Sequence, residues 1–114
     1  MITLKGSNVT INVKDLDKSI SFYEALGLKQ ENRWGNFYAQ VTGPGITIGL
    51  HPSNNLPGNS GGVSIGFTTD NLDDARSALQ QSFINATERN EEGGQFLHFK
   101  DPDGTEIYFI KPKW

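Results

Sequence analysis

A weak internal repeat limits the fold of this chain more than any other feature of its sequence. The alternating segment Val9-x-Ile11-x-Val13 leads into Asp15, and Val63-x-Ile65-x-Phe67 leads into Asp70, with an offset of 54 to 56 residues. In each copy a period-2 apolar segment is followed by an acidic turn and then by a helical pattern. The repeat therefore predicts two similar modules that each begin with a strand and a helix.

The expected elements follow the same order in both halves. The first half is expected to contain a strand over 8–13, a helix from Asp15 or Asp17 to about Leu26, a short strand near 29–34, and strands over 37–42 and 46–51. The second half is expected to contain a strand over 63–68, a helix over 72–82, an edge strand near 86–89, and strands over 95–100 and 105–110. Each half thus reads as βαβββ.

The length of the chain fits a single domain made of these two halves. At 114 residues it is long enough to bury roughly two-thirds of its unfolded surface. The segment 52–62 is rich in Pro, Gly, Ser and Asn, which is typical of a linker. We expect one domain over 1–114, with module one at 1–51, the linker at 52–62 and module two at 63–114.

Composition excludes several classes of partner and site. The formal net charge of −3 gives no electrostatic reason to expect nucleic acid or an anionic membrane. The chain has no cysteine, which excludes disulfides and thiolate metal sites. No apolar run approaches the roughly 18 residues of a membrane span, and no signal-peptide core follows Met1. We expect a soluble cytoplasmic protein that binds a small molecule.

Two motifs at opposite ends of the chain resemble a known family. The segment 9–23, VTINVKDLDKSISFY, continues to Leu26-Gly27-Leu28, and the segment 99–104 reads FKDPDG. Together with the repeat, they resemble the vicinal oxygen chelate superfamily, which includes glyoxalase I, extradiol dioxygenases, fosfomycin-modifying enzymes and bleomycin-binding resistance proteins. The resemblance implies an α+β fold in which two βαβββ modules form a curled, partly closed mixed β-barrel with the helices outside. It also implies a homodimer, with the cavity inside one chain or shared between two.

The same resemblance places the metal ligands of the metal-dependent members at three positions. These positions hold Asn8, Ser64 and Tyr108 here, where the family typically has His, His or Gln, and Glu. An amide, a hydroxyl and a phenol are poor substitutes for imidazole and carboxylate ligands of a divalent metal. The sequence therefore predicts that no metal is bound at these positions, and whether the chain is an enzyme stays open.

Strand alternation predicts which side chains face the cavity. If Val9, Ile11 and Val13 pack under the helix, then every second residue from Asn8 faces the other way. Extended to the other strands, this parity gives an aromatic and uncharged-polar lining, which is typical of small-molecule pockets. The predicted ligand-binding residues are Asn8, Thr10, Trp34, Tyr38, Gln40, His51, Ser64, Phe96, His98, Glu106 and Tyr108. Phe37 is expected to fill the core instead.

The two histidines allow more than one interpretation. His51, His98 and Glu106 could converge as a displaced divalent-metal site or as acid–base groups, whereas a structural role places His51 at a strand end and His98 in a cross-strand pair. The hypothesis adopted is a glyoxalase/bleomycin resistance-like, metal-independent protein that binds a small aromatic or cationic molecule. The alternatives are a metal-dependent lyase or dioxygenase with nonstandard ligands, a metal-free isomerase using His51 or His98, and a protein-interaction module.

Overall fold

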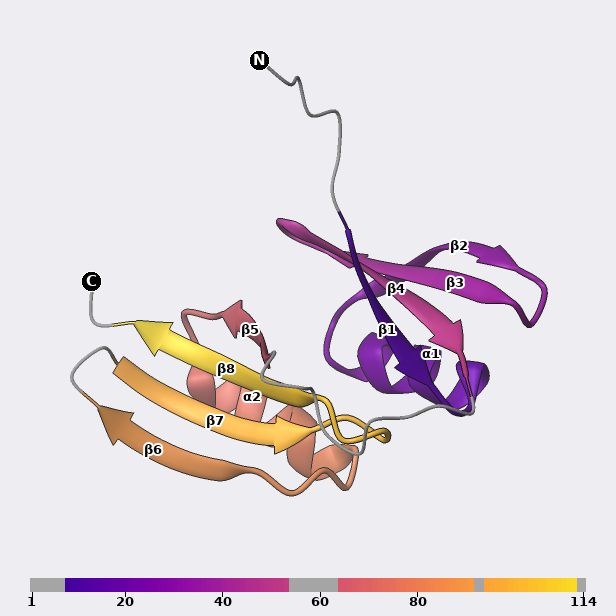
Figure 1. Cartoon of the computed structure of the whole chain (residues 1–114). Coiled ribbons are helices and arrows are strands. Elements are labelled where there is room, and N and C mark those ends of the chain that lie inside the picture. The colour runs from indigo at the N-terminus through magenta and orange to yellow at the C-terminus, as the bar shows by residue number, and fades with distance from the viewer. Residues whose placement is uncertain (1–7, 54–63, 92–93, 113–114) are drawn as a thin grey trace, which may run out of the picture. The chain divides into compact units, whose positions relative to one another are not determined.

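The computed structural model describes residues 8–53, 64–91 and 94–112, and the chain divides into two compact units, Met1–Leu56 and Pro57–Trp114. The first unit contains β1 (Val9–Val13), α1 (Leu16–Ala25), β2 (Lys29–Trp34), β3 (Tyr38–Gly43) and β4 (Ile46–Pro52). The second contains β5 (Ser64–Thr68), α2 (Leu72–Gln81), β6 (Thr87–Glu91), β7 (Gly94–Lys100) and β8 (Glu106–Pro112). The predicted βαβββ order is confirmed in both units (Figure 1).

Each unit is a four-stranded mixed sheet with one helix. The strand orders are β1-β4-β3-β2 and β5-β8-β7-β6, in which β1 pairs with β4 and β5 with β8 in parallel while the other neighbours are antiparallel. This establishes the predicted α+β class. Among the described strands no hydrogen-bonded ladder joins the two sheets, so the barrel stays a prediction.

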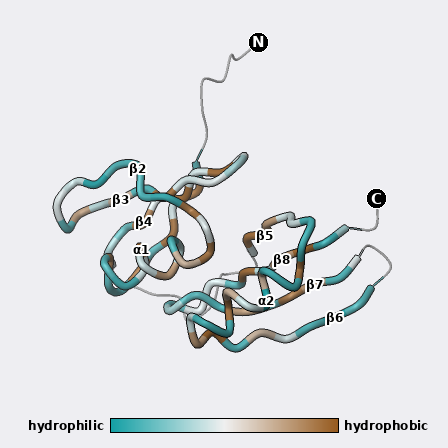
Figure 2. The backbone as a smooth tube through the Cα atoms, turned by 180° about the vertical axis from the view of Figure 1, so that it is seen from behind, coloured by the Kyte–Doolittle hydropathy of each residue, from teal (hydrophilic) through white to brown (hydrophobic). Residues whose placement is uncertain are grey.

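The edge strands opposite β1 and β5 are polar. Every residue of β2 and of β6 is exposed, and both strands are largely hydrophilic in Figure 2. Charged side chains on an edge strand discourage further strand pairing. In each unit an ion pair joins this edge strand to the helix. Arg33 on β2 pairs with Asp17 on α1, and Arg76 on α2 pairs with Glu88 on β6.

Both helices begin and end with the same local chemistry, 56 positions apart along the chain. Asp15 accepts a hydrogen bond from the backbone N–H of Lys18, and Asn71 accepts one from Asp74, so both are N-caps. At the other end, the N–H groups of Gly27 and Leu28 bond back to Glu24 and Tyr23. This is a Schellman motif, and the second unit repeats it with Phe83 and Ile84.

The core of each unit lies between its helix and one face of its sheet. The buried residues of the first unit are Val13, Leu16, Ile20, Tyr23, Leu28, Ala39, Val41, Ile48 and Leu50, and those of the second are Ile65, Leu72, Leu79, Leu97, Phe99 and Ile107. The strand alternation was predicted correctly for these buried strand residues, but Val9 at the open end of β1 is exposed and Ile11 and Phe67 are only half-buried. Val63, predicted to begin the first strand of the second half, lies outside the described residues.

Two further expectations were wrong. Phe37 does not fill the core: its side chain is 81% exposed, because the residue belongs to the turn between β2 and β3 and not to a strand. Pro52 is not linker but the last residue of β4, where it lies opposite Val13 of β1. Residues 54–63, which include most of the predicted linker, lie outside the described residues.

Neither helix within the described residues is both long and apolar enough to cross a membrane.

Candidate functional site

The predicted site residues lie on the helix-free face of the two sheets, and they divide between the two units. Cross-strand register places Thr10, Gln40 and Gly49 in one row of the first sheet, with His51 opposite Asn12 and Trp34 opposite Tyr38. In the second sheet Ser64 lies opposite Glu106, and His98 lies opposite Tyr108. Each half of the predicted set is therefore brought together within its own sheet.

In the first unit, hydrogen bonds organise this face around a tyrosine. The Asn8 amide donates to Thr10 Oγ1 at 3.2 Å, and Thr10 Oγ1 lies 3.3 Å from the hydroxyl of Tyr38. The Tyr38 hydroxyl occupies the space above Gly49, where a Cβ would collide with it. Glycine at position 49 thus allows the close approach of the ring, and any larger residue would force the Tyr38 side chain to shift.

The rest of the first face is an amide pair and a second aromatic ring. Asn32 donates to Gln40 Oε1 at 3.2 Å, and the Trp34 and Tyr38 rings lie 5.5 Å apart. The Trp34 side chain is 53% exposed. An exposed ring beside amide groups offers one surface for stacking and several hydrogen bonds to a ligand.

Arg33 holds the hairpin that carries Trp34. Its guanidinium donates to Asp17 Oδ1 at 2.7 Å, to the carbonyl of Gly35 at 2.8 Å and to Asn36 Oδ1 at 2.8 Å. The planar guanidinium makes these bonds in a fixed geometry, which orders the β2–β3 turn against the start of α1. Sequence analysis missed Arg33, because its partners become neighbours only when β2 lies beside α1.

In the second unit, three rings form a cluster on the helix-free face. The ring centroids of Phe96 and His98 are 5.7 Å apart and nearly parallel, and Tyr108 lies 5.9 Å from Phe96 and 5.7 Å from His98. Tyr108 covers Gly66, whose Cβ, if present, would collide with the ring. The aromatic cluster Phe96–His98–Tyr108 is the most concentrated group of rings among the predicted site residues.

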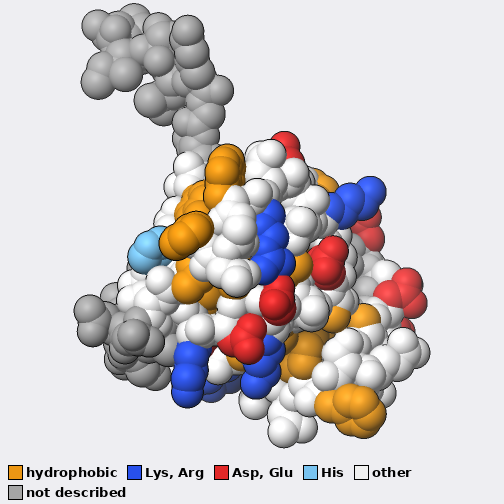
Figure 3. Space-filling view, turned by 90° about the vertical axis from the view of Figure 1, so that its right-hand side faces the viewer, with side chains coloured by type: hydrophobic (Ala, Val, Ile, Leu, Met, Phe, Trp, Pro, Cys, Tyr) orange, Lys and Arg blue, Asp and Glu red, His pale blue; other side chains and the backbone are white. Residues whose placement is uncertain are grey.

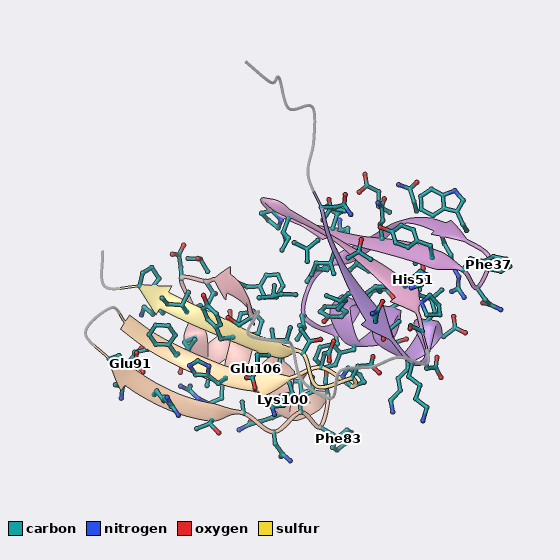
Figure 4. All side chains as sticks on the ribbon, in the orientation of Figure 1. Phe37, His51, Phe83, Glu91, Lys100 and Glu106 are labelled. Atoms are coloured by element: carbon teal, nitrogen blue, oxygen red, sulfur yellow. The ribbon has the colours of Figure 1, made fainter. Side chains whose placement is uncertain are left out.

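Charged side chains flank this cluster. Glu106 Oε1 lies 3.5 Å from Lys100 Nζ, and these two residues are opposite each other across β8 and β7 (Figure 4). Arg89 on β6 lies opposite Phe96. Sequence analysis missed both cations, although Lys100 could have been found from its spacing of two residues after His98. The face drawn in Figure 3 likewise carries both signs of charge.

The donor set does not fit the metal site that the resemblance implies. The three corresponding positions hold an amide, a hydroxyl and a phenol, and Asn8 already bonds Thr10 while the Tyr108 ring lies against Phe96 and His98. Over the described ranges, no group of three His, Asp or Glu side chains is placed to hold a metal ion. His51 belongs to the first unit, whereas His98 and Glu106 belong to the second.

The turn before β8 has a structural role. Asp101 is buried, and its Oδ1 accepts hydrogen bonds from the backbone N–H groups of Asp103 and Thr105 at 2.9 and 2.8 Å. Gly104 adopts φ 90°, which favours glycine. This turn fixes the start of β8 and therefore the positions of Glu106 and Tyr108 on the sheet.

Comparison with protein-family models identifies the family. Residues 7–109 match the model of the Glyoxalase/Bleomycin resistance protein/Dioxygenase superfamily. The chain belongs to this superfamily. A protein of Mycolicibacterium smegmatis is 32% identical over 77 residues, a match that covers 63% of this chain and 61% of that relative. The chain thus spans less than two thirds of the relative that it matches.

Several solved structures share this fold at low sequence identity. The genomically encoded fosfomycin resistance protein FosX of Listeria monocytogenes is 19% identical, with a TM-score of 0.83 over 99% of this chain and 96% of its own. A bleomycin-binding protein solved with bleomycin is 18% identical, with a TM-score of 0.75 over 96% and 100%. A superfamily domain from Frankia sp. is 24% identical, with a TM-score of 0.75 over 97% and 100%. At these identities the likeness shows the fold alone.

Proposed function

We propose that this superfamily member binds a planar aromatic small molecule and that it does so without a metal ion. The observation that carries the proposal is the aromatic cluster Phe96–His98–Tyr108 on a helix-free sheet face. Offset or edge-to-face contact with such rings is worth about 0.5–1.5 kcal/mol per pair beyond the area buried. A planar ligand would gain this stacking free energy from more than one ring at once.

The charges beside the cluster narrow the class of ligand that fits this face. A cationic group on the ligand would compete with Lys100 for Glu106, and on β6 Arg89 and Glu91 add one charge of each sign to the same face. We therefore propose a neutral aromatic ligand, and not the cationic one that Glu106 taken alone would favour. Exposed ion pairs contribute only about 0–1 kcal/mol, so stacking dominates the proposed affinity.

The surroundings of His98 favour binding over acid–base catalysis. A catalytic histidine needs a group that orients its ring and a reacting proton within hydrogen-bond reach. The ring contacts of His98 in this structure are Phe96 and Tyr108, and the nearby carboxylate of Glu106 contacts Lys100. This arrangement supports a stacking role for His98. The proposal keeps the predicted homodimer and cytoplasmic location as parts of the same hypothesis.

Ligand titration tests the proposal. Bleomycin and a set of neutral fused-ring compounds would be titrated into metal-free protein and followed by saturation-transfer NMR and calorimetry. We expect a fused-ring compound to bind, and Tyr108→Ala and His98→Ala each to weaken its binding about tenfold through lost stacking. Phe83→Asn removes an exposed ring on the helix side and should leave the affinity unchanged.

Metal independence needs a separate measurement. The protein would be incubated with iron(II), manganese, nickel or zinc and desalted, and its metal content determined by plasma mass spectrometry. We expect no stoichiometric metal and the same ligand affinity after treatment with a chelator. A retained metal that Glu106→Gln or His98→Ala releases would contradict metal independence, and failure of every aromatic compound to bind would contradict the ligand class.

A further inference from the structure

A cavity of about 260 Å³ lies on the helix side of the second sheet. Its floor is apolar, because Leu79 of α2 and Leu97 of β7 line it and are each only 2% exposed. Ile84 and Ala86, which lie between the end of α2 and the start of β6, add an apolar wall. The cavity is therefore separate from the aromatic cluster, which occupies the helix-free side of the same sheet.

The mouth of the cavity carries an excess of negative charge. Arg76 and Glu88 both line the cavity, and Arg76 Nη2 donates a hydrogen bond to Glu88 Oε1 at 2.6 Å. Arg76 Nη1 also donates to Asp73 Oδ1, so that one guanidinium is shared by two carboxylates. These three side chains together have a net charge of −1. Each carboxylate also has a second oxygen that is not the acceptor in these two bonds.

Two amide side chains complete the polar part of the cavity. Gln80 and Asn85 line it, and both residues are exposed. Over the described ranges neither amide side chain has a hydrogen-bond partner. An ammonium group carries three N–H donors and no acceptor, and the carboxylate of Glu88 with the two amide oxygens offers three acceptors. The polar lining therefore suits a primary ammonium group.

The first unit has apolar side chains at the equivalent helix positions. The offset of 56 between the N-caps Asp15 and Asn71 makes Ile20 the counterpart of Arg76 and Tyr23 the counterpart of Leu79. Both Ile20 and Tyr23 are buried. The second unit thus has an ion-paired arginine and a smaller side chain, next to a cavity, where the first unit has two large buried side chains.

The volume of the cavity limits the size of a ligand. A cavity of roughly 150 Å³ holds benzene, whereas sites for drug-sized ligands measure about 300–1,000 Å³. A volume of about 260 Å³ therefore fits one ring with a short chain.

We infer that this cavity binds a small primary amine, whose single ring lies against Leu79 and Leu97 and whose ammonium group bonds Glu88. A carboxylate in place of the amine would meet the two carboxylates at the mouth. A neutral alcohol would leave their excess charge without a counter-charge. This inference does not depend on the proposed function, which concerns the opposite face of the sheet.

Titration of three probes with the same ring tests the inference. The probes are 2-phenylethylamine, 2-phenylethanol and 3-phenylpropionate, added to the ¹⁵N-labelled full chain and followed by amide chemical shifts. We expect the amine to bind with a dissociation constant of about 0.1–1 mM and to shift the amides of Leu79, Ile84 and Leu97. The alcohol and the carboxylate should bind about fivefold more weakly, because the mouth of the cavity is partly exposed to solvent.

Three variants locate the site and its charge. Glu88→Gln keeps the size of the side chain but removes its charge, and it should weaken amine binding about fivefold without affecting the alcohol. Glu91→Gln makes the same change on the same strand but on the helix-free face (Figure 4), and it should leave amine binding within about twofold of wild type. Ala86→Leu fills the cavity from an exposed position and should weaken both the amine and the alcohol, with circular dichroism checking its fold.

Several results would overturn the inference. These are failure of the amine to bind at about 10 mM, binding of the carboxylate as tight as that of the amine, and equal effects of Glu88→Gln and Glu91→Gln. Amide shifts confined to Phe96, His98 and Tyr108 would assign the amine to the aromatic cluster and would overturn it as well.

Discussion

The two units have the same order of elements, but their helices pack against their sheets differently. In the first unit α1 buries Leu16, Ile20 and Tyr23 against its sheet, and Gly27 ends the helix without strain. In the second unit α2 buries only Leu72 and Leu79 among the described residues, and an ion-paired arginine takes the middle of the stripe. The first helix is thus held by apolar packing along its length, whereas the second has an ion pair at its middle and is followed by the exposed ring of Phe83. Reciprocal substitutions between the units test this difference.

The largest effect is expected from exchanging the central residues of the two helices. Ile20→Arg would bury a charge against β3 and β4 with no acidic partner shown there, and should lower the free energy of unfolding by about 3–5 kcal/mol. Arg76→Ile removes two exposed ion pairs and should leave the free energy of unfolding nearly unchanged. Urea unfolding followed by circular dichroism measures both. Equal effects of the two substitutions on the free energy of unfolding would show that the two helices pack alike.

The next largest difference in stability is expected between the turn that joins β7 to β8 and the turn that joins β3 to β4. In the second unit Asp101 is buried and accepts two backbone hydrogen bonds, so Asp101→Ala should cost about 2 kcal/mol. The first unit turns at Gly45 with φ 77°, and Gly45→Ala should cost about 1 kcal/mol through backbone strain alone. Urea unfolding followed by circular dichroism compares the costs of these two substitutions. A cost for Asp101→Ala no larger than that for Gly45→Ala would mean that the buried carboxylate adds nothing to its turn.

The helix ends should respond with opposite signs. In dilute solution Phe83→Gly should raise stability by about 0.5–1 kcal/mol, because glycine relieves the positive φ, whereas Gly27→Phe should lower it by about 1–2 kcal/mol. Thermal unfolding at low protein concentration is the appropriate measurement. If Phe83→Gly destabilised the dilute protein, its ring would have a packing role within one chain.

The smallest effect concerns the ion pairs between each helix and its edge strand. Hydrogen bonds donated to Glu88 and Asp73 raise the pKa of the Arg76 guanidinium, which stays charged at every physiological pH. Arg33→Ala should cost only about 0.5–1 kcal/mol, since the pair with Asp17 is exposed. A double-mutant cycle of Arg33 with Asp17 gives the coupling energy directly. The order parameters of the β2–β3 turn should fall more clearly than stability does.

Much of the fold could be predicted because it rests on local chemistry. Alternation identified the buried, helix-facing residues of most strands, and the acidic turn with Asp15 and Asp17 identified the start of α1, where Asp15 is the N-cap. The prediction failed at Phe37, because hydrophobicity alone does not tell a turn residue from the first residue of a strand. The candidate site was predicted by parity within each strand, but parity does not give the partner across the sheet. Lys100 beside Glu106 and Arg89 beside Phe96 depend on strand register.

The sequence by itself determined the repeated βαβββ order, the family and the set of side chains that avoid the helices, since these depend on periodicity and on turn chemistry within short segments. Only the tertiary structure decided how those side chains combine. Tyr108 lies against His98 because β7 and β8 pair in one particular register, and Arg76 pairs with Glu88 because the fold brings α2 and β6 together. Such contacts join residues from different elements, and their geometry exists only after the strands and the helix have packed.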